Sequence, residues 1–252
     1  MTGNRAIYNA HYTADQLDLP TEPYDRHIAE ARLRLVRTYA PGADVLDLCC
    51  GTGAYLMPGL DAVRSAVGVD FSARMLRAFR EKFGGRMPGN LRLIEADATA
   101  LPLAGGLFDF VFSFTALYYI ENLEAVIREV ARVLRPGGHA ALEFGNSRGL
   151  TPRITRKFHH EQNWALTHPA PLGQIHAMLG SAGLEILGAR RFQIVPLFGA
   201  PRGMRYLRPF TSPRLKPIFG ARLGARTVDE ILSGMWPLKH FAFRHILVVQ
   251  KP

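Results

Sequence analysis

The sequence predicts an α/β fold built on a doubly wound, mostly parallel sheet with helices on both faces. Three observations support this prediction. Five short apolar segments between residues 44 and 144 alternate with segments of helical periodicity, which is the pattern of parallel strands joined by crossover helices. Glycine or proline marks many of the joints between them. The composition, with 48% hydrophobic and 21% charged residues among 252, is that of a globular chain.

The first half of the chain supplies most of the expected elements. A helix over 24–40 repeats apolar side chains at helical spacing and ends at Pro41-Gly42. Ser72 is placed to cap a later helix. The expected strands are 44–48, 65–70, 91–95, 108–114 and 139–144. Three further helices are expected: one from Ala54, one over 73–83 and one over 122–134.

Beyond Gly145 the alternation is looser. A helix is expected over 172–182, and strands over 184–194 and 241–250. Repeated prolines interrupt residues 196–237, which we interpret as an insertion between the last two strands and not as a separate domain.

The ends of the expected strands carry the chemically informative residues, because ligands of an open parallel sheet bind outside its carboxyl ends. The first strand runs into Asp47-Leu-Cys-Cys-Gly51-Thr-Gly53, whose glycines permit a tight turn and a close approach to a ligand. The dinucleotide fingerprint would require Gly or Ala at Leu56, and Asp47 would repel a pyrophosphate. Asp70 lies at the end of the second expected strand, where an acidic residue binds the ribose hydroxyls of the ligand in open parallel α/β folds. A ligand with an amino group, a sulfonium and an adenosine fits this set, and S-adenosylmethionine combines all three.

Five successive motifs resemble those of the class I S-adenosylmethionine-dependent methyltransferases. The similar branch is the small-molecule one, which includes the ubiquinone and menaquinone biosynthesis methyltransferases. The motifs are Val45-Leu-Asp-Leu-Cys-Cys-Gly-Thr-Gly53, Gly68-Val-Asp-Phe-Ser-Ala-Arg-Met-Leu76, Glu95-Ala-Asp-Ala-Thr-Ala-Leu-Pro102, Phe108-Asp-Phe-Val-Phe-Ser113 and Val133-Leu-Arg-Pro-Gly-Gly138. The resemblance covers residues 25–146 well and the last two strands loosely. It implies a seven-stranded Rossmann-like sheet of order 3-2-1-4-5-7-6 whose last strand is antiparallel.

The resemblance also implies contacts with the cofactor. Asp47 would lie at the loop that contacts the methionine amino group, with Gly51 and Gly53 allowing the close approach. Cys49 belongs to the same loop and stands where family members usually have glycine, so we expect only a slight change there. Asp70 would accept hydrogen bonds from both ribose hydroxyls.

The adenine and the methyl group would meet a second set of residues. Phe71 and Met75 would pack on the adenine, although apolar residues at helical spacing can equally belong to the core. Asp97 would accept a hydrogen bond from the adenine amino group, and Ala98 would offer its backbone amide. Ser113 would line the methyl-donor end.

Candidate catalytic residues are His159, His160 and Tyr118. A carbon or phenolic oxygen acceptor benefits from a general base, and histidine has a suitable pKa. The alternatives are two surface histidines and a core tyrosine. No metal site is expected, because the adjacent Cys49 and Cys50 lack metal-ligand spacing.

The resemblance implies one methyltransferase domain over residues 1–252. An N-terminal helical cap (1–40), a cofactor-binding core (41–146) and an acceptor-side half (147–252) would compose it. Within that half, 196–237 is the basic insertion and would help to cover the acceptor. Tyr8, Tyr12 and Tyr24 are candidates for a lid over the cofactor.

The net charge of +10 is unevenly distributed. Residues 1–146 carry 15 Lys/Arg and 17 Asp/Glu, whereas residues 147–252 carry 16 and 4. No acid occurs from Ile186 to Val228. Three interpretations stay open: a solvated basic face, contact with an anionic membrane surface or a phosphorylated acceptor, and nucleic acid, which lacks a recognisable binding module here.

These observations predict an S-adenosylmethionine-dependent methyltransferase acting on oxygen or carbon of a small or lipid-linked metabolite. The alternatives are a nucleic-acid (RNA) methyltransferase and a non-catalytic S-adenosylmethionine-binding protein. The sequence has no run of 18 apolar residues and no signal-peptide core. We therefore expect a cytoplasmic protein, with peripheral membrane attachment as an open alternative.

Overall fold

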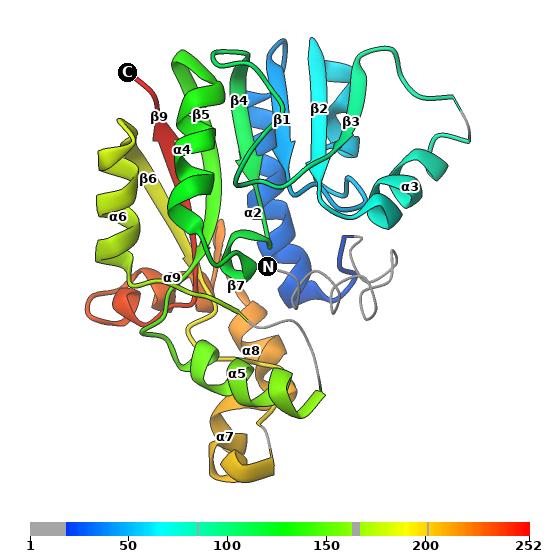
Figure 1. Ribbon diagram of the computed structural model, residues 1–252. Helices are drawn as coiled ribbons and strands as arrows, with labels where there is room; N and C mark the ends of the chain where they lie inside the picture. The colour runs from blue at the N-terminus through cyan, green and yellow to red at the C-terminus, as the bar shows by residue number, and fades with distance from the viewer. Residues whose placement is uncertain (1–18, 85, 163–166, 201) are drawn as a thin grey trace.

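The computed structural model describes residues 19–84, 86–162, 167–200 and 202–252, with the backbone alone over 158–162. Its main feature is a seven-stranded sheet of order β3-β2-β1-β4-β5-β9-β6 (Figure 1). The strands are β1 Asp44–Leu48, β2 Ser65–Asp70, β3 Leu91–Glu95, β4 Phe108–Ser113, β5 Leu134–Gly145, β6 Glu185–Phe192 and β9 Arg244–Gln250. Strands β1 to β5 pair in parallel, and β9 is antiparallel to both β5 and β6. The expected fold class and strand order are confirmed.

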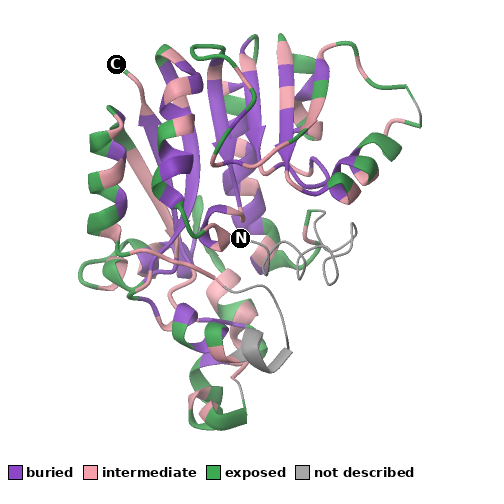
Figure 2. Ribbon diagram, in the orientation of Figure 1, coloured by how far each residue is buried: buried purple, intermediate pink, exposed green. Residues whose placement is uncertain are grey.

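Helices cover both faces of this sheet. On one face, α2 (Pro23–Tyr39) and α3 (Ala73–Glu81) share a buried cluster with β1 and β4. On the other, α4 (Leu123–Val133) and α6 (Leu172–Ser181) pack against β4, β5 and β9. Figure 2 shows the central strands β1, β4, β5 and β9 as the most continuously buried part of the molecule. The Ser72 cap forms as expected, since its hydroxyl accepts a hydrogen bond from the Met75 amide; Asn122 caps α4 in the same way by accepting from the Ala125 amide.

Two expected elements differ in the structure. The helix expected from Ala54 is wrong: a turn is followed by a short 3-10 helix, Met57–Ala62. Pro58 lacks an amide hydrogen and Gly59 weakens helices, so a longer α-helix is disfavoured here. Strand β5 begins at Leu134 and not at His139, because residues 135–138 form an irregularity between two paired stretches of the strand.

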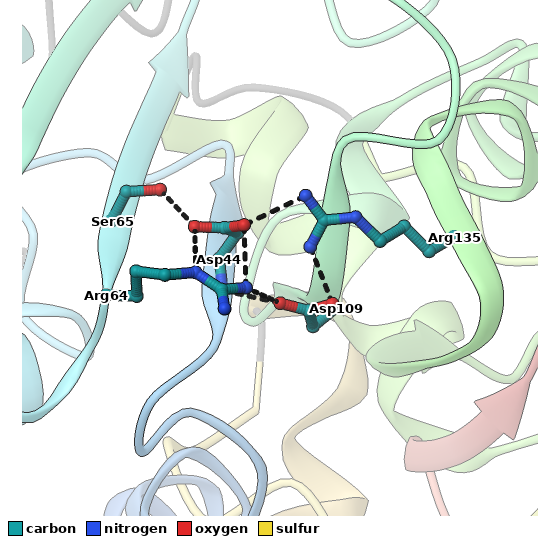
Figure 3. Close-up of polar contacts among 5 residues, drawn as sticks. All are labelled: Asp44, Arg64, Ser65, Asp109 and Arg135. Carbon is teal, nitrogen blue, oxygen red and sulfur yellow. Dashed lines mark hydrogen bonds and ion pairs between the residues drawn. The ribbon is translucent and has the colours of Figure 1, made fainter.

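An ion-pair network closes the edge of the sheet where the parallel strands begin (Figure 3). The Asp44 carboxylate accepts hydrogen bonds from Arg64 at 2.8 and 2.9 Å, and it pairs with Arg135 at 2.9 Å. Asp109 pairs with the same two arginines. The hydrogen bonds from Arg64 hold the pKa of Asp44 below its usual range. Both carboxylates at this edge are therefore neutralised by arginine.

The opposite edge, where the parallel strands end, faces segments that follow β5 in the sequence. Strand β9 runs toward the C-terminus at the top of Figure 1, so the strands parallel to β5 end at the bottom. Helix α5 (Leu150–Gln162) lies there, together with α7 (Arg208–Thr211) and α8 (Lys216–Gly220) of the basic insertion. The insertion also contains η4 Arg202–Leu207, η5 Pro213–Leu215, β7 Arg222–Leu223, β8 Arg226–Thr227 and α9 Val228–Gly234. Among the helices of the described residues, none has the length and apolar character needed to cross a membrane.

One end of the insertion is fixed to the sheet and to α2 by buried polar contacts. The Asp229 carboxylate accepts hydrogen bonds from the amides of Gln193 (2.7 Å) and Ile194 (3.1 Å) just after β6. Glu230 pairs with Arg190 of β6 at 2.6 Å and lies 3.2 Å from the His27 ring of α2. Helix α9 is thus a rigid part of the fold.

Tyr24 is a core residue and not part of a lid. It is 5% exposed and belongs to the buried cluster that also contains Phe192 and Leu197. The backbone of Gly220 in α8 packs directly on it, since a Cβ there would lie 3.4 Å from Tyr24. The other two lid candidates, Tyr8 and Tyr12, lie outside the described residues.

Candidate cofactor-binding site

The loop after β1 is held against the end of β2 by backbone hydrogen bonds. The Cys50 amide donates to the Val69 carbonyl at 2.9 Å, and the Gly51 amide donates to the Asp70 carboxylate at 2.9 Å. Three loop residues, Cys49, Gly51 and Gly53, have φ values of 61°, 54° and 74°. A glycine turn therefore brings β1 and β2 to one site, as the resemblance implies.

Three carboxylates act electrostatically on the Cys49 thiol. Burial raises the pKa of the Cys49 thiol, and the negative charges of Asp70, Asp47 and Asp97 raise it further. The thiol is therefore protonated at neutral pH and is not a nucleophile. The acids from the ends of β1, β2 and β3 thus all lie within electrostatic reach of this thiol.

Asp47 differs from the acids at the opposite edge of the sheet. Its side chain is 4% exposed, and no hydrogen bond or ion pair within the described part of the chain reaches its carboxylate. Burial raises its pKa well above the usual value, and the charge of Asp70 adds to this. Asp44, three residues earlier on the same strand, has its charge compensated by arginine. A buried carboxylate without a cation is electrostatically complementary to a cationic group, which would lower this pKa.

Asp70 and Asp97 are oriented by their own loops. Asp70 accepts the amides of Gly51 and Ser72, both at 2.9 Å. Oδ1 of Asp97 accepts the amide and hydroxyl of Thr99 at 2.9 and 2.7 Å. The recorded contacts of Asp97 thus all use one oxygen, so the other is available for a ligand amino group.

The remaining residues expected at the cofactor differ in how exposed their side chains are. Phe71 follows Asp70 and is partly exposed. Met75 is 1% exposed and Ala98 is buried, so neither side chain offers much surface. Ser113 is fully buried at the end of β4. Their contacts with a cofactor stay predictions.

Tyr118 lies in a short 3-10 helix, η3 (Leu117–Tyr119), directly after β4. Its hydroxyl accepts a hydrogen bond from Arg244 at 2.8 Å. Burial raises the pKa of Tyr118, so the phenol stays protonated at neutral pH and can donate a hydrogen bond but cannot accept a proton as a base. His159 and His160 lie on the backbone of α5, but their side chains are outside the described part of the structure.

A buried ion cluster beside Tyr118 was not expected from the sequence. The Glu143 carboxylate, 0% exposed, accepts hydrogen bonds from Arg32 at 2.6 and 2.9 Å and from Arg244 at 2.5 Å. Arg32 also donates to the Tyr55 hydroxyl at 2.6 Å. The only signal in the sequence is an acid within the apolar strand His139–Phe144. The cluster connects α2, the loop after β1, β5 and β9.

Comparison with known proteins finds similar sequences for the first half of the chain. Residues 45–138 match a family described as methyltransferase domain. A demethylmenaquinone methyltransferase from Shouchella clausii is 37% identical over 100 residues, which cover 38% of this chain and 43% of that enzyme. The chain thus matches less than half the length of this relative.

Solved structures share the fold at low identity. The methyltransferase in a complex with the Haloferax volcanii Trm112 methyltransferase activator superposes with a TM-score of 0.64 at 18% identity, covering 97% of this chain and 96% of that one. An S-adenosylmethionine-dependent methyltransferase from Mesorhizobium loti gives 0.59 at 18% identity, covering 87% and 96%. Residues 45–138 therefore match a methyltransferase domain, the chain has the fold of the solved methyltransferases, and its first half is similar to the demethylmenaquinone methyltransferases.

Proposed function

We propose that this chain transfers a methyl group from S-adenosylmethionine to an oxygen or carbon of a small, lipid-linked acceptor of the quinol class. The observation that carries the proposal is the buried Asp47 carboxylate, which has no cationic partner among the described residues. The quinol class is suggested by the relatives named demethylmenaquinone methyltransferase.

The residues fit the cofactor in charge and in order. S-adenosylmethionine supplies an electrophilic methyl group on a sulfonium when bound. Asp47 would hold the amino group of its methionine part, Asp70 the ribose hydroxyls and Asp97 the adenine amino group. The glycine turn lets the backbone approach closely. Methyl transfer is an in-line displacement, and fixing both reactants can lower the barrier by about 7–11 kcal/mol.

The cofactor assignment is tested with Asp47→Asn, which keeps the shape and removes the charge. Binding of S-adenosylhomocysteine, which retains the amino group, should weaken by about 1.5–3 kcal/mol in calorimetry. The free energy of unfolding of the unliganded variant should rise, because a buried carboxylate with a raised pKa destabilises the fold at neutral pH.

Asp44→Asn is the matched control, since it removes an acid from the opposite end of the same strand. It should leave affinity unchanged and lower stability slightly, because Asp44 is paired with Arg64 and Arg135. Unchanged affinity in a folded Asp47→Asn protein would refute the assignment.

The general base is proposed to be His159 or His160, while Tyr118 would orient the acceptor by donating a hydrogen bond. Replacing the true base with alanine should lower kcat about 10²–10⁴-fold with a demethylated naphthoquinol as acceptor. Tyr118→Phe should act mainly on KM. If both histidine variants keep wild-type rates, the two histidines are surface residues and the base assignment fails.

Peripheral contact with an anionic membrane is proposed for the tip of the basic insertion. Tyr206 and Phe210 are 72% and 64% exposed there. Arginines alternate with these aromatics, and helix α5 adds exposed cations at Arg153 and Arg156. Each cation near an anionic surface contributes about 1 kcal/mol.

Vesicle flotation tests this contact. The protein should bind anionic vesicles at low salt and release at about 1 M salt, where screening reaches about 3 Å. Exchanging Arg202 and Arg205 for Ser should weaken binding without changing cofactor affinity. Failure of the wild-type protein to bind at low salt would refute membrane contact and leave the methyltransferase proposal unaffected.

A further inference from the structure

A cavity of about 560 Å³ opens within the basic insertion, and its lining includes none of the residues expected to bind the cofactor. Its lining combines apolar and cationic groups. The lining residues are Phe198, Gly199, Ala200, Arg208, Ser212, Pro213 and Arg214. This volume lies within the range of small-molecule sites, about 300–1,000 Å³.

The two arginines of this cavity lack a carboxylate partner in the described part of the chain. No ion pair or side-chain hydrogen bond of Arg208 or Arg214 is recorded. Other cations of the same stretch are engaged: Arg190 pairs with Glu230, and Lys216 pairs with Asp25 at 3.0 Å. Because no acid occurs from 186 to 228, the cavity is complementary to an anion.

The polar geometry suits a phosphate. Guanidinium groups bind phosphate oxygens through paired hydrogen bonds. The Ser212 oxygen accepts the Arg214 amide at 3.3 Å, so its hydroxyl hydrogen is left to donate. Gly199 has a φ of 103°, and a Cβ there would meet no atom within 4 Å, so this glycine leaves the wall open.

The apolar part of the lining indicates that the phosphate carries a hydrocarbon portion. Phe198 and Pro213 face the same cavity as the arginines. We infer that this cavity binds the phosphate of an amphiphilic phosphate ester, with the hydrocarbon against the apolar wall. The source is a lipid headgroup or a soluble phosphate ester. The inference deepens the proposed membrane contact and does not depend on methyl transfer.

Calorimetric titration with three soluble probes tests the site. The probes are inorganic phosphate, glycerol 3-phosphate and dihexanoyl phosphatidylglycerol below its micelle concentration. Saturable binding of one molecule per chain is expected. At least tenfold tighter binding of dihexanoyl phosphatidylglycerol than of glycerol 3-phosphate assigns a lipid headgroup, and equal binding assigns a soluble ester.

Two double variants that remove the same number of positive charges distinguish a specific phosphate site from general electrostatic attraction. Arg208→Gln with Arg214→Gln should weaken binding at least tenfold. Arg222→Gln with Arg226→Gln removes the same charge from the exposed β7–β8 turn and should change it less than twofold. The inference would be overturned if both double variants lost the same affinity for the probes, or if no probe bound saturably to the wild type. Melting curves and S-adenosylhomocysteine affinity check that both variants fold and that the cofactor site is intact.

Discussion

Replacing Glu143 with alanine should destabilise this protein more than any substitution of a surface acid. Its carboxylate is fully buried and accepts three hydrogen bonds from Arg32 and Arg244. Without it, the Arg32 guanidinium is left buried and unneutralised, while Arg244, with 20% of its side chain exposed, is partly hydrated. Breaking a buried pair in this way costs about 3–5 kcal/mol. At about 2–4 °C per kcal/mol, the melting temperature should fall by roughly 6–20 °C.

The measurement is urea unfolding at pH 7, with Glu124→Ala as the control. Glu124 forms the same kind of pair with Arg128 at 2.8 Å, but both side chains are about 60% exposed, so its loss should cost less than about 1 kcal/mol. Equal destabilisation in the two variants would refute the reasoning.

Acid titration adds a second test of the same cluster. Burial alone would raise the pKa of Glu143, but Arg32 and Arg244 hold it below its usual value. A lowered native pKa means that the pair contributes fully above the unfolded pKa, about 4.3, and loses its contribution as the pH falls through the native pKa. The stability difference between the wild type and Glu143→Gln should therefore shrink below that pH.

Three further predictions concern the loop after β1 and strand β9. Cys49→Gly should stabilise the protein by about 1 kcal/mol in urea unfolding, because Cys49 has a φ of 61°; a loss of stability would show that the thiol packs favourably. Gly53→Ala should destabilise by about 1–3 kcal/mol, since its Cβ would lie 2.0 Å from the Phe79 ring; a neutral effect would contradict this packing. Burial, with a smaller effect of Arg191, lowers the pKa of His245 to about 4, so stability should fall as the pH drops from about 6.5 toward 4, by up to about 1.4 kcal/mol per unit. His245→Gln should lack this slope between pH 7 and 5.

Strands β1 to β5 and the three acids near their ends could be predicted because each is marked by residues that are close together in the sequence. Each strand from β1 to β5 contains a short apolar segment, and the three acids lie in the last residues of a strand or just after it. Parallel pairing then brings Asp47, Asp70 and Asp97 together without any further information. The positive φ of Cys49 was not predicted. It agrees with the glycine that family members usually have at this position.

The charged core could not be predicted, because its partners are far apart along the chain. Glu143 bonds to Arg32 across 111 residues and to Arg244 across 101. Many arginines could have paired with one buried acid, and no periodicity chooses among them. Tyr24 was misassigned for a similar reason: the residues that cover it, in α8, come from an insertion without a periodic pattern.

The insertion leaves the sheet and returns to it at adjoining points. The chain departs after Phe192 and rejoins at Arg244, and the Phe243 amide donates to the Gln193 carbonyl at 3.1 Å. Lengthening a connection between two such points costs only about 0.6 kcal/mol per doubling. This segment can therefore be exchanged during evolution while the strands that present Asp47 and Asp70 stay as they are.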